Sequence, residues 1–131
     1  MTNFGITENP GTKSAATTRR KKALAASLLA AASSFLEAGD EEQAADLAVR
    51  ARTLDHRNEE ILALCRRLAD LAYRRGRAAQ REGTNSALNR AYAEFNEALR
   101  RYPQHSWARR RSEETRPAGV IRRGKREIFL P

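Results

Sequence analysis

The abundance of alanine constrains the fold of this chain more than any other feature. Alanine occupies 24 of the 131 positions, whereas only eight residues are aromatic. A core made from such side chains is small, and it requires backbones that approach one another closely. The seven glycines and four prolines gather mostly near the chain ends and between segments, which disfavours an all-β chain. The length fits one domain, and we expect an all-α fold.

Apolar residues recur every three to four positions along the middle of the chain, which is typical of helices with one buried face. We expect helices at about 17–38, 41–54, 59–82 and 87–102, and a short fifth helix at 106–114. Thr17 or Ser14 can cap the first helix. Gly39 can end the first helix in the left-handed conformation, while Asp40 and Asn58 can cap the next two. Short loops between helices of this length predict antiparallel neighbours.

These elements divide the chain into a disordered N-terminal tail at 1–16, a helical domain at 17–114 and a basic C-terminal tail at 115–131. Gly76 is expected to weaken the third helix, and Arg75 falls near its apolar face. A bend at Gly76 or a salt bridge, with the second helix as one source of the acid, would accommodate Arg75. The predicted buried positions are Leu24, Leu28, Ala31, Ala32, Phe35, Ala44, Leu47, Ala48, Ala51, Leu54, Ile61, Leu64, Cys65, Leu68, Ala72, Ala79, Leu88, Ala91, Tyr92, Phe95, Ala98 and Leu99.

The charge is strongly basic and uneven. The net charge is +9, although residues 31–60 carry a net charge of −5. On a helical projection, one face of the third helix opposite its apolar stripe is basic, with only Asp70 interrupting it over about 22 Å. This face could contact an acidic protein or nucleic-acid phosphates, or it could be a solvated helix face. The basic residues of this face and of the C-terminal segments are Arg66, Arg67, Arg74, Arg77, Arg81, Arg109, Arg110, Arg111, Arg122, Arg123, Lys125 and Arg126.

Two stretches of the chain repeat one another. In the first, residues 39–44 form a Gly-Asp-Glu-Glu-Gln-Ala turn, Ala51 follows Ala44 by seven residues, and Leu28, Ala32 and Phe35 make a large–small–large set. Both stretches resemble tetratricopeptide repeats, and together they cover about residues 25–105. The second matches the family at small, aromatic and proline positions, which are Ala91, Phe95, Ala98 and Pro103.

The resemblance has departures. Ala48 stands where the family has a large residue, and His56 stands where it has proline. Ala44 and Ala91 are 47 residues apart, compared with a family period of about 34 residues. The resemblance implies a protein-binding scaffold with two repeats and a short C-terminal helix. The family's concave groove would correspond to Leu29, Ser33, Leu36, Arg67, Asp70 and Arg74, although Leu29 and Leu36 could instead pack on the tail or on the fifth helix.

No motif for catalysis, a cofactor or a metal occurs, and we expect a protein that is not an enzyme. His56 and His105 fall in turns, and Cys65 falls on an apolar face. No run of 18 apolar residues occurs, so we expect no membrane span. The composition, with a single cysteine and therefore no internal disulfide, suggests an intracellular, cytoplasmic protein, with an N-terminal targeting segment as a minor alternative.

The function we expect is that of a small basic scaffold or adaptor. Two repeats are fewer than such architectures usually need, so a protein partner or self-association would stabilise the chain. The alternative is an accessory protein that binds RNA or DNA without sequence specificity. Nucleic acid would then meet the basic face and tails through its phosphates, since no base-reading motif is present.

Overall fold

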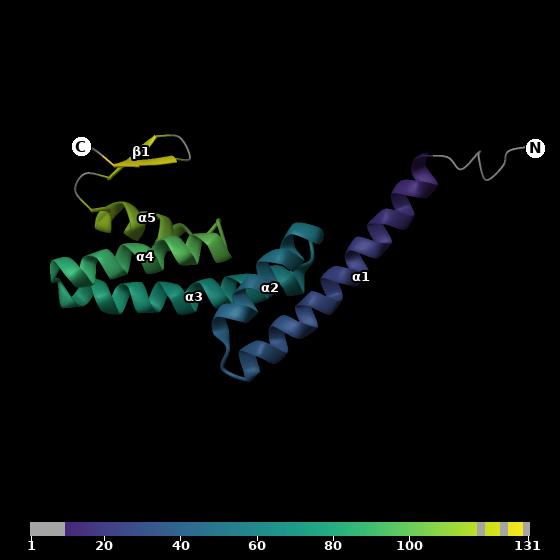
Figure 1. Ribbon diagram of the computed structural model, residues 1–131, viewed down its shortest axis with the longest axis horizontal. Coiled ribbons are helices and arrows are strands. Elements are labelled where there is room, and N and C mark those ends of the chain that lie inside the picture. The colour runs from purple at the N-terminus through teal and green to yellow at the C-terminus, as the bar shows by residue number, and fades with distance from the viewer. Residues whose placement is uncertain (1–9, 118–119, 124–125, 130–131) are drawn as a thin grey trace, which may run out of the picture. The chain divides into compact units, whose positions relative to one another are not determined.

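The computed structural model describes residues 10–117, 120–123 and 126–129, with side chains for residues 14–117. The predicted helical domain is confirmed, and two short antiparallel strands follow the last helix (Figure 1). The helices are α1 (Pro10–Glu37), α2 (Glu41–Leu54), α3 (Glu59–Glu82), α4 (Asn85–Arg101) and α5 (Ser106–Thr115). The strands are β1 (Val120–Arg123) and β2 (Arg126–Phe129).

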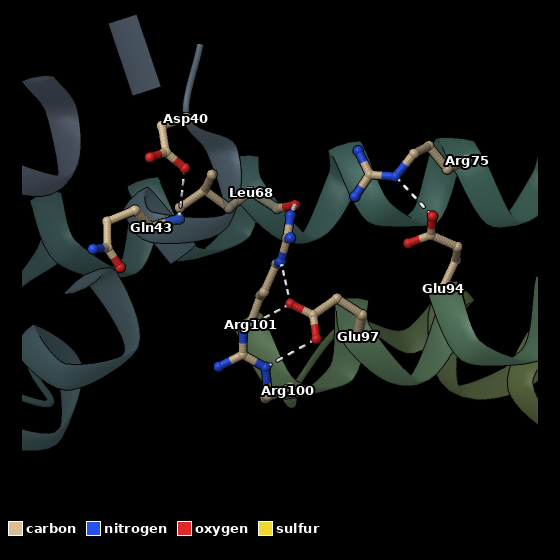
Figure 2. Close-up of polar contacts among 8 residues, drawn as sticks. All are labelled: Asp40, Gln43, Leu68, Arg75, Glu94, Glu97, Arg100 and Arg101. Atoms are coloured by element: carbon tan, nitrogen blue, oxygen red, sulfur yellow. Dashed lines mark hydrogen bonds and ion pairs between the residues drawn. The ribbon is translucent and has the colours of Figure 1, made fainter. Parts of the chain in front are cut away.

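Helix ends follow the capping residues that the sequence indicated. Gly39 has φ of 86° and ends α1 in the left-handed conformation. Asp40 caps α2, because its Oδ1 accepts a hydrogen bond from the Gln43 amide at 3.2 Å (Figure 2). Asn58 caps α3 by accepting from the amides of Glu60 and Ile61 at 2.9 and 3.1 Å.

Two boundaries differ from the expectation. α1 begins at Pro10 rather than near Ser14 or Thr17, so residues 10–16 are helical; residues 1–9 lie outside the described part of the chain. Proline suits the first turn of a helix, where its missing N–H leaves no bond unmade. At the other end, the expected extended tail contains two paired strands, in which Val120 is opposite Phe129 and Arg123 is opposite Arg126.

The chain divides into two compact units, with the boundary inside α3 between Leu64 and Cys65. The first unit contains the α1–α2 hairpin and the start of α3. The second contains the rest of α3 together with α4, α5 and the two strands. Each unit is described separately below. Among the described residues, no helix is both long enough and apolar enough to cross a membrane.

Alanine methyl groups form the seam between α1 and α2 in the first unit. Ala25 and Ala32 of α1 are fully buried, and α1 packs closely on α2. Leu24 and Phe35 are 52% and 37% exposed, so their predicted burial was wrong. The buried stripe is rotated toward the small residues, because alanine lets two helix backbones approach where leucine or phenylalanine would hold them apart. The fully buried residues of α2 are Ala44, Ala45, Ala48 and Ala51.

The second unit pairs α3 and α4 in antiparallel fashion, and α5 packs on α4 (Figure 1). The register follows from three contacts: Arg101 reaches Leu68, Glu94 reaches Arg75, and Arg90 reaches Glu82. The predicted apolar faces are confirmed for both helices, although Leu88 and Leu99 are only half-buried. The fully buried side chains here include Cys65, Leu68, Ala72, Ala91, Phe95 and Ala98.

α3 continues through Gly76 and ends at Glu82, as predicted. Gly76 is buried, and a Cβ placed on it would lie 2.5 Å from Cε1 of Phe95. The missing side chain therefore makes room for the Phe95 ring, which also contacts Tyr73 with ring centroids 5.6 Å apart. Packing of this aromatic ring offsets the cost of about 1 kcal/mol that glycine carries in a helix.

Candidate interaction surface

Every carboxylate side chain within residues 65–117 is engaged by a basic side chain of the same stretch. Residues 65–117 contain six acidic side chains, and each lies within ion-pair distance of a basic side chain of the same unit. Engagement of this kind fixes side chains, although exposed pairs contribute little stability. The pairs are Asp70–His105 at 2.8 Å, Glu82–Arg90 at 3.0 Å, Glu94–Arg75 at 2.8 Å, Glu97–Arg100 and Glu97–Arg101 at 2.7 Å, Glu113–Arg116 at 3.2 Å and Glu114–Arg111 at 2.9 Å.

Arg75 occupies a different environment from the one expected. Its side chain is 44% exposed, and its Nε donates to Oε2 of Glu94 on α4 (Figure 2). The acid of this ion pair comes from the fourth helix. Solvent reaches the guanidinium alongside α4, so no bend at Gly76 is needed to accommodate the charge.

A buried guanidinium ties α4 to α3. Arg101 is 3% exposed; its Nη1 donates to the Leu68 carbonyl at 2.9 Å and its Nε donates to Glu97 at 2.7 Å (Figure 2). Burial alone would raise the pKa of Glu97, but the hydrogen bonds from Arg100 and Arg101 outweigh it and hold that pKa below its ordinary value. Glu97 is therefore ionised at neutral pH and supplies the counter-charge that a buried arginine requires.

His105 joins the start of α5 to α3. Its Nδ1 accepts a hydrogen bond from the Ala108 amide at 3.1 Å, which makes His105 the N-cap of α5. Because Nδ1 is an acceptor, we assign the proton to Nε2, which donates to Asp70 at 2.8 Å. The Tyr73 ring lies 5.0 Å from the imidazole, centroid to centroid. Asp70, a predicted groove residue, is half-buried and held by His105.

The predicted basic face of α3 separates into two kinds of arginine. Arg66 lies over the Tyr102 ring at 5.2 Å and donates to its hydroxyl, and Arg77 donates to Gln80 at 2.8 Å. Arg67, Arg74 and Arg81 are exposed and make no hydrogen bond or ion pair within the described residues. We name these three the arginine ladder. They are seven residues apart and therefore recur about every 10.5 Å along one side of the helix.

The arginines after α4 are mostly engaged. Arg109 donates to the Pro103 carbonyl at 2.7 Å, and Arg110 lies over the exposed Trp107 ring at 5.2 Å. The hydrogen bond to Glu114 raises the pKa of Arg111 and lowers that of Glu114. In the C-terminal hairpin, the side chains of Arg122, Arg123 and Arg126 and the whole of Lys125 lie outside the described residues.

The remaining predicted groove residues, Leu29, Ser33 and Leu36, belong to the first unit, where they are half-buried on α1. They flank the buried Ala25 and Ala32 and so lie beside the alanine seam. Arg67, Asp70 and Arg74 belong to the second unit, as described above. The groove as a whole therefore draws on both units and stays a prediction.

Sequence reasoning missed one hollow of the first unit, with a volume of about 380 Å³. One side comes from α1, with Lys21 and Lys22, and the other from the end of α2 and the following turn, with Asp55, His56 and Arg57. No sequence spacing could have found it, because its two sides are more than thirty residues apart. The same part of α1 exposes Arg19 and Arg20.

Within residues 14–117, no group of three or more His, Cys, Asp or Glu side chains is placed to hold a metal ion. Comparison of the chain with protein-family models, curated proteins and solved structures found no match.

Proposed function

We propose that this chain is a small tetratricopeptide-like helical scaffold that joins proteins within an assembly and holds an acidic partner on its second unit. The observation that carries the proposal is the contrast between engaged carboxylates and unengaged arginines in residues 65–117. All six carboxylates are paired internally, whereas the arginine ladder is exposed and unpaired. Three like charges on one side of a helix repel one another, and binding of an acidic partner relieves this repulsion. The same charges attract the acidic partner to the surface.

The repeat-like packing supports the scaffold part of the proposal. The small residues that resemble the family's packing positions are fully buried in both units, with Ala44 and Ala51 on α2 and Ala91 and Ala98 on α4. Phe95, at the aromatic position, is also fully buried. Close helix packing of this kind leaves the outer helix faces available for partners.

A pull-down with matched variants tests the proposal. The ladder variant replaces Arg67, Arg74 and Arg81 with Gln, and the control variant makes the same replacement at Arg19, Arg20 and Arg50, which are also exposed and unpaired. Both variants lose three positive charges. We expect the same acidic protein to be captured from lysate with and without nuclease treatment, retained by the control variant and lost by the ladder variant. Capture that is equal for all three chains would refute the proposal.

Nucleic-acid binding is the second candidate, and the run of exposed bases on α1 favours it. Arg19, Arg20, Lys21 and Lys22 are consecutive, exposed and without an ion pair in the described part of the chain. Binding to phosphates depends on the number of charges more than on their arrangement, and it weakens steeply with salt. This candidate predicts capture that is lost on nuclease treatment and is weakened similarly by the ladder and control variants.

A further inference from the structure

We infer that the arginine ladder is a docking seam for an acidic amphipathic α-helix of the partner protein, with carboxylates spaced seven residues apart. The inference rests on the proposed function and specifies its partner. It starts from the residues that lie between the ladder positions on the same side of α3.

The ladder and its neighbours follow the repeat of a helix-packing seam. Arg67, Leu71, Arg74, Ala78 and Arg81 are separated by steps of four and three residues, which average 3.5. A repeat of 3.5 residues keeps one stripe of a helix facing a second helix over several turns. Leu71 is half-buried and Ala78 is exposed, so the seam alternates charged and apolar side chains.

The spacing of the charges matches that of a second helix. Seven residues of α-helix rise about 10.5 Å in any chain, so carboxylates at positions i, i+7 and i+14 of a partner helix recur at the distance that separates the ladder arginines. A guanidinium can bind both oxygens of a carboxylate, and this favours arginine over lysine at such positions. Three pairs could therefore form in register along about 21 Å of α3.

Residues 65–117 hold α3 in place but put no carboxylate within ion-pair distance of the ladder. Arg101 binds the Leu68 carbonyl, and the Phe95 ring packs over Gly76. Asp70 is the acid nearest to the ladder on the helical projection, and His105 engages it at 2.8 Å. The partner must therefore bring its own carboxylates to a surface that is already ordered.

Replacement of Ala78 can distinguish binding of a helical partner from binding of a flexible or duplex polyanion. Ala78 is a small exposed residue between Arg74 and Arg81, where a partner helix can approach the α3 backbone. Replacing it with arginine adds positive charge but fills this space. Contacts with phosphates require charge at reachable positions and no such space, so the same replacement would strengthen nucleic-acid binding.

The test uses three probes and the full chain. The first probe is a synthetic helical peptide of about four heptads, with Glu at one position of each heptad and Leu or Ala at the intervening seam position. The second has the same composition and capped ends, but its Glu residues follow no repeat. The third is a short DNA duplex. Dissociation constants are measured for the unchanged chain, the ladder variant, the Arg19/Arg20/Arg50→Gln control and Ala78→Arg, with circular dichroism to verify that each variant is helical.

We expect the heptad peptide to bind the unchanged chain about tenfold or more tightly than the irregular peptide. The ladder variant and Ala78→Arg should each weaken heptad-peptide binding by about tenfold or more, whereas the control should change it by less than about twofold. Equal binding of the two peptides, or tighter peptide binding by Ala78→Arg, would overturn the helical seam and leave the acidic-partner proposal standing. Binding of the duplex but of neither peptide would overturn both.

Discussion

The two units achieve helix packing by different means. In the first, α1 and α2 meet through alanine methyl groups, whereas the larger Leu24 and Phe35 stay exposed. In the second, the Phe95 ring enters a space left by Gly76, and the buried Arg101 bonds the backbone of the neighbouring helix. Stabilisation by apolar burial scales with the area removed from water, so a seam of alanines gains less than a buried aromatic ring. We therefore expect the second unit to depend on a few large contacts and the first on many small ones.

The replacement Phe95→Ala should have the largest effect, because it removes the main aromatic contact of the second unit and leaves a cavity beside Gly76. Such truncations in a core cost about 3–5 kcal/mol. Urea unfolding measures the loss, and hydrogen exchange should show reduced protection in α4 and α5. The control is Leu24→Ala, which removes a side chain that is already 52% exposed. Equal destabilisation by both replacements would contradict the contrast between the units.

The replacement Ala32→Leu tests the alanine seam in the opposite direction, by adding volume. Ala32 is fully buried in the first unit, so three extra carbons must push α1 and α2 apart, at a cost of about 1–3 kcal/mol. The matched control is Ala30→Leu, at an exposed position of the same helix. Thermal unfolding of the two variants makes the comparison. If the seam is loosely packed, Ala32→Leu will not lower the unfolding temperature, and this outcome would contradict the prediction.

Local signals in the sequence predicted much of the fold. The helix starts at Asp40 and Asn58 and the turn at Gly39 depend on neighbouring residues only, and they are confirmed. The apolar faces of α3 and α4 were also found, because large side chains mark them. The predicted buried face of α1 included Ala32, which is fully buried, but also Leu24 and Phe35, which are exposed. Periodicity gives weight to large hydrophobic residues and cannot tell which of two neighbouring stripes forms the contact.

Contacts between distant residues could not be predicted. The role of Gly76 depends on Phe95, and the environment of Arg75 depends on Glu94, both on the next helix. The basic face of α3 was visible from helical spacing. Which of its arginines are unpaired was not visible, because that depends on Tyr102, which engages Arg66, and on whether the nearby acids have partners elsewhere. The sequence thus predicted the basic face of α3, and the structure shows which three of its arginines form the unpaired ladder.

Replacements of His105 should have a smaller effect, because they act on one helix end. His105→Ala removes both the acceptor for the Ala108 amide and the bond to Asp70, and loss of such a cap costs about 1 kcal/mol. His105→Asn retains a capping oxygen and should recover much of that loss. Hydrogen exchange of the first turn of α5 measures the difference. Equal exchange in both variants would show that capping by His105 does not stabilise the helix.

The smallest effect we expect is a loss of folding stability at low pH, which is caused by protonation of Glu97. The pKa of Glu97 is lowered from its ordinary value of 4.5 in the folded chain, since bonds from Arg100 and Arg101 outweigh the opposing effect of burial. A lowered pKa means that the unfolded chain takes up the proton first, so this stabilisation is complete above pH 4.5 and is lost as the pH falls through the folded value. Because Glu97 is partly solvated, we expect at most about 1 kcal/mol. Urea midpoints measured between about pH 6 and about pH 3 report this loss, and Glu97→Gln should flatten the dependence on pH. If Glu97→Gln keeps the full slope, the loss of stability in acid originates at other carboxylates.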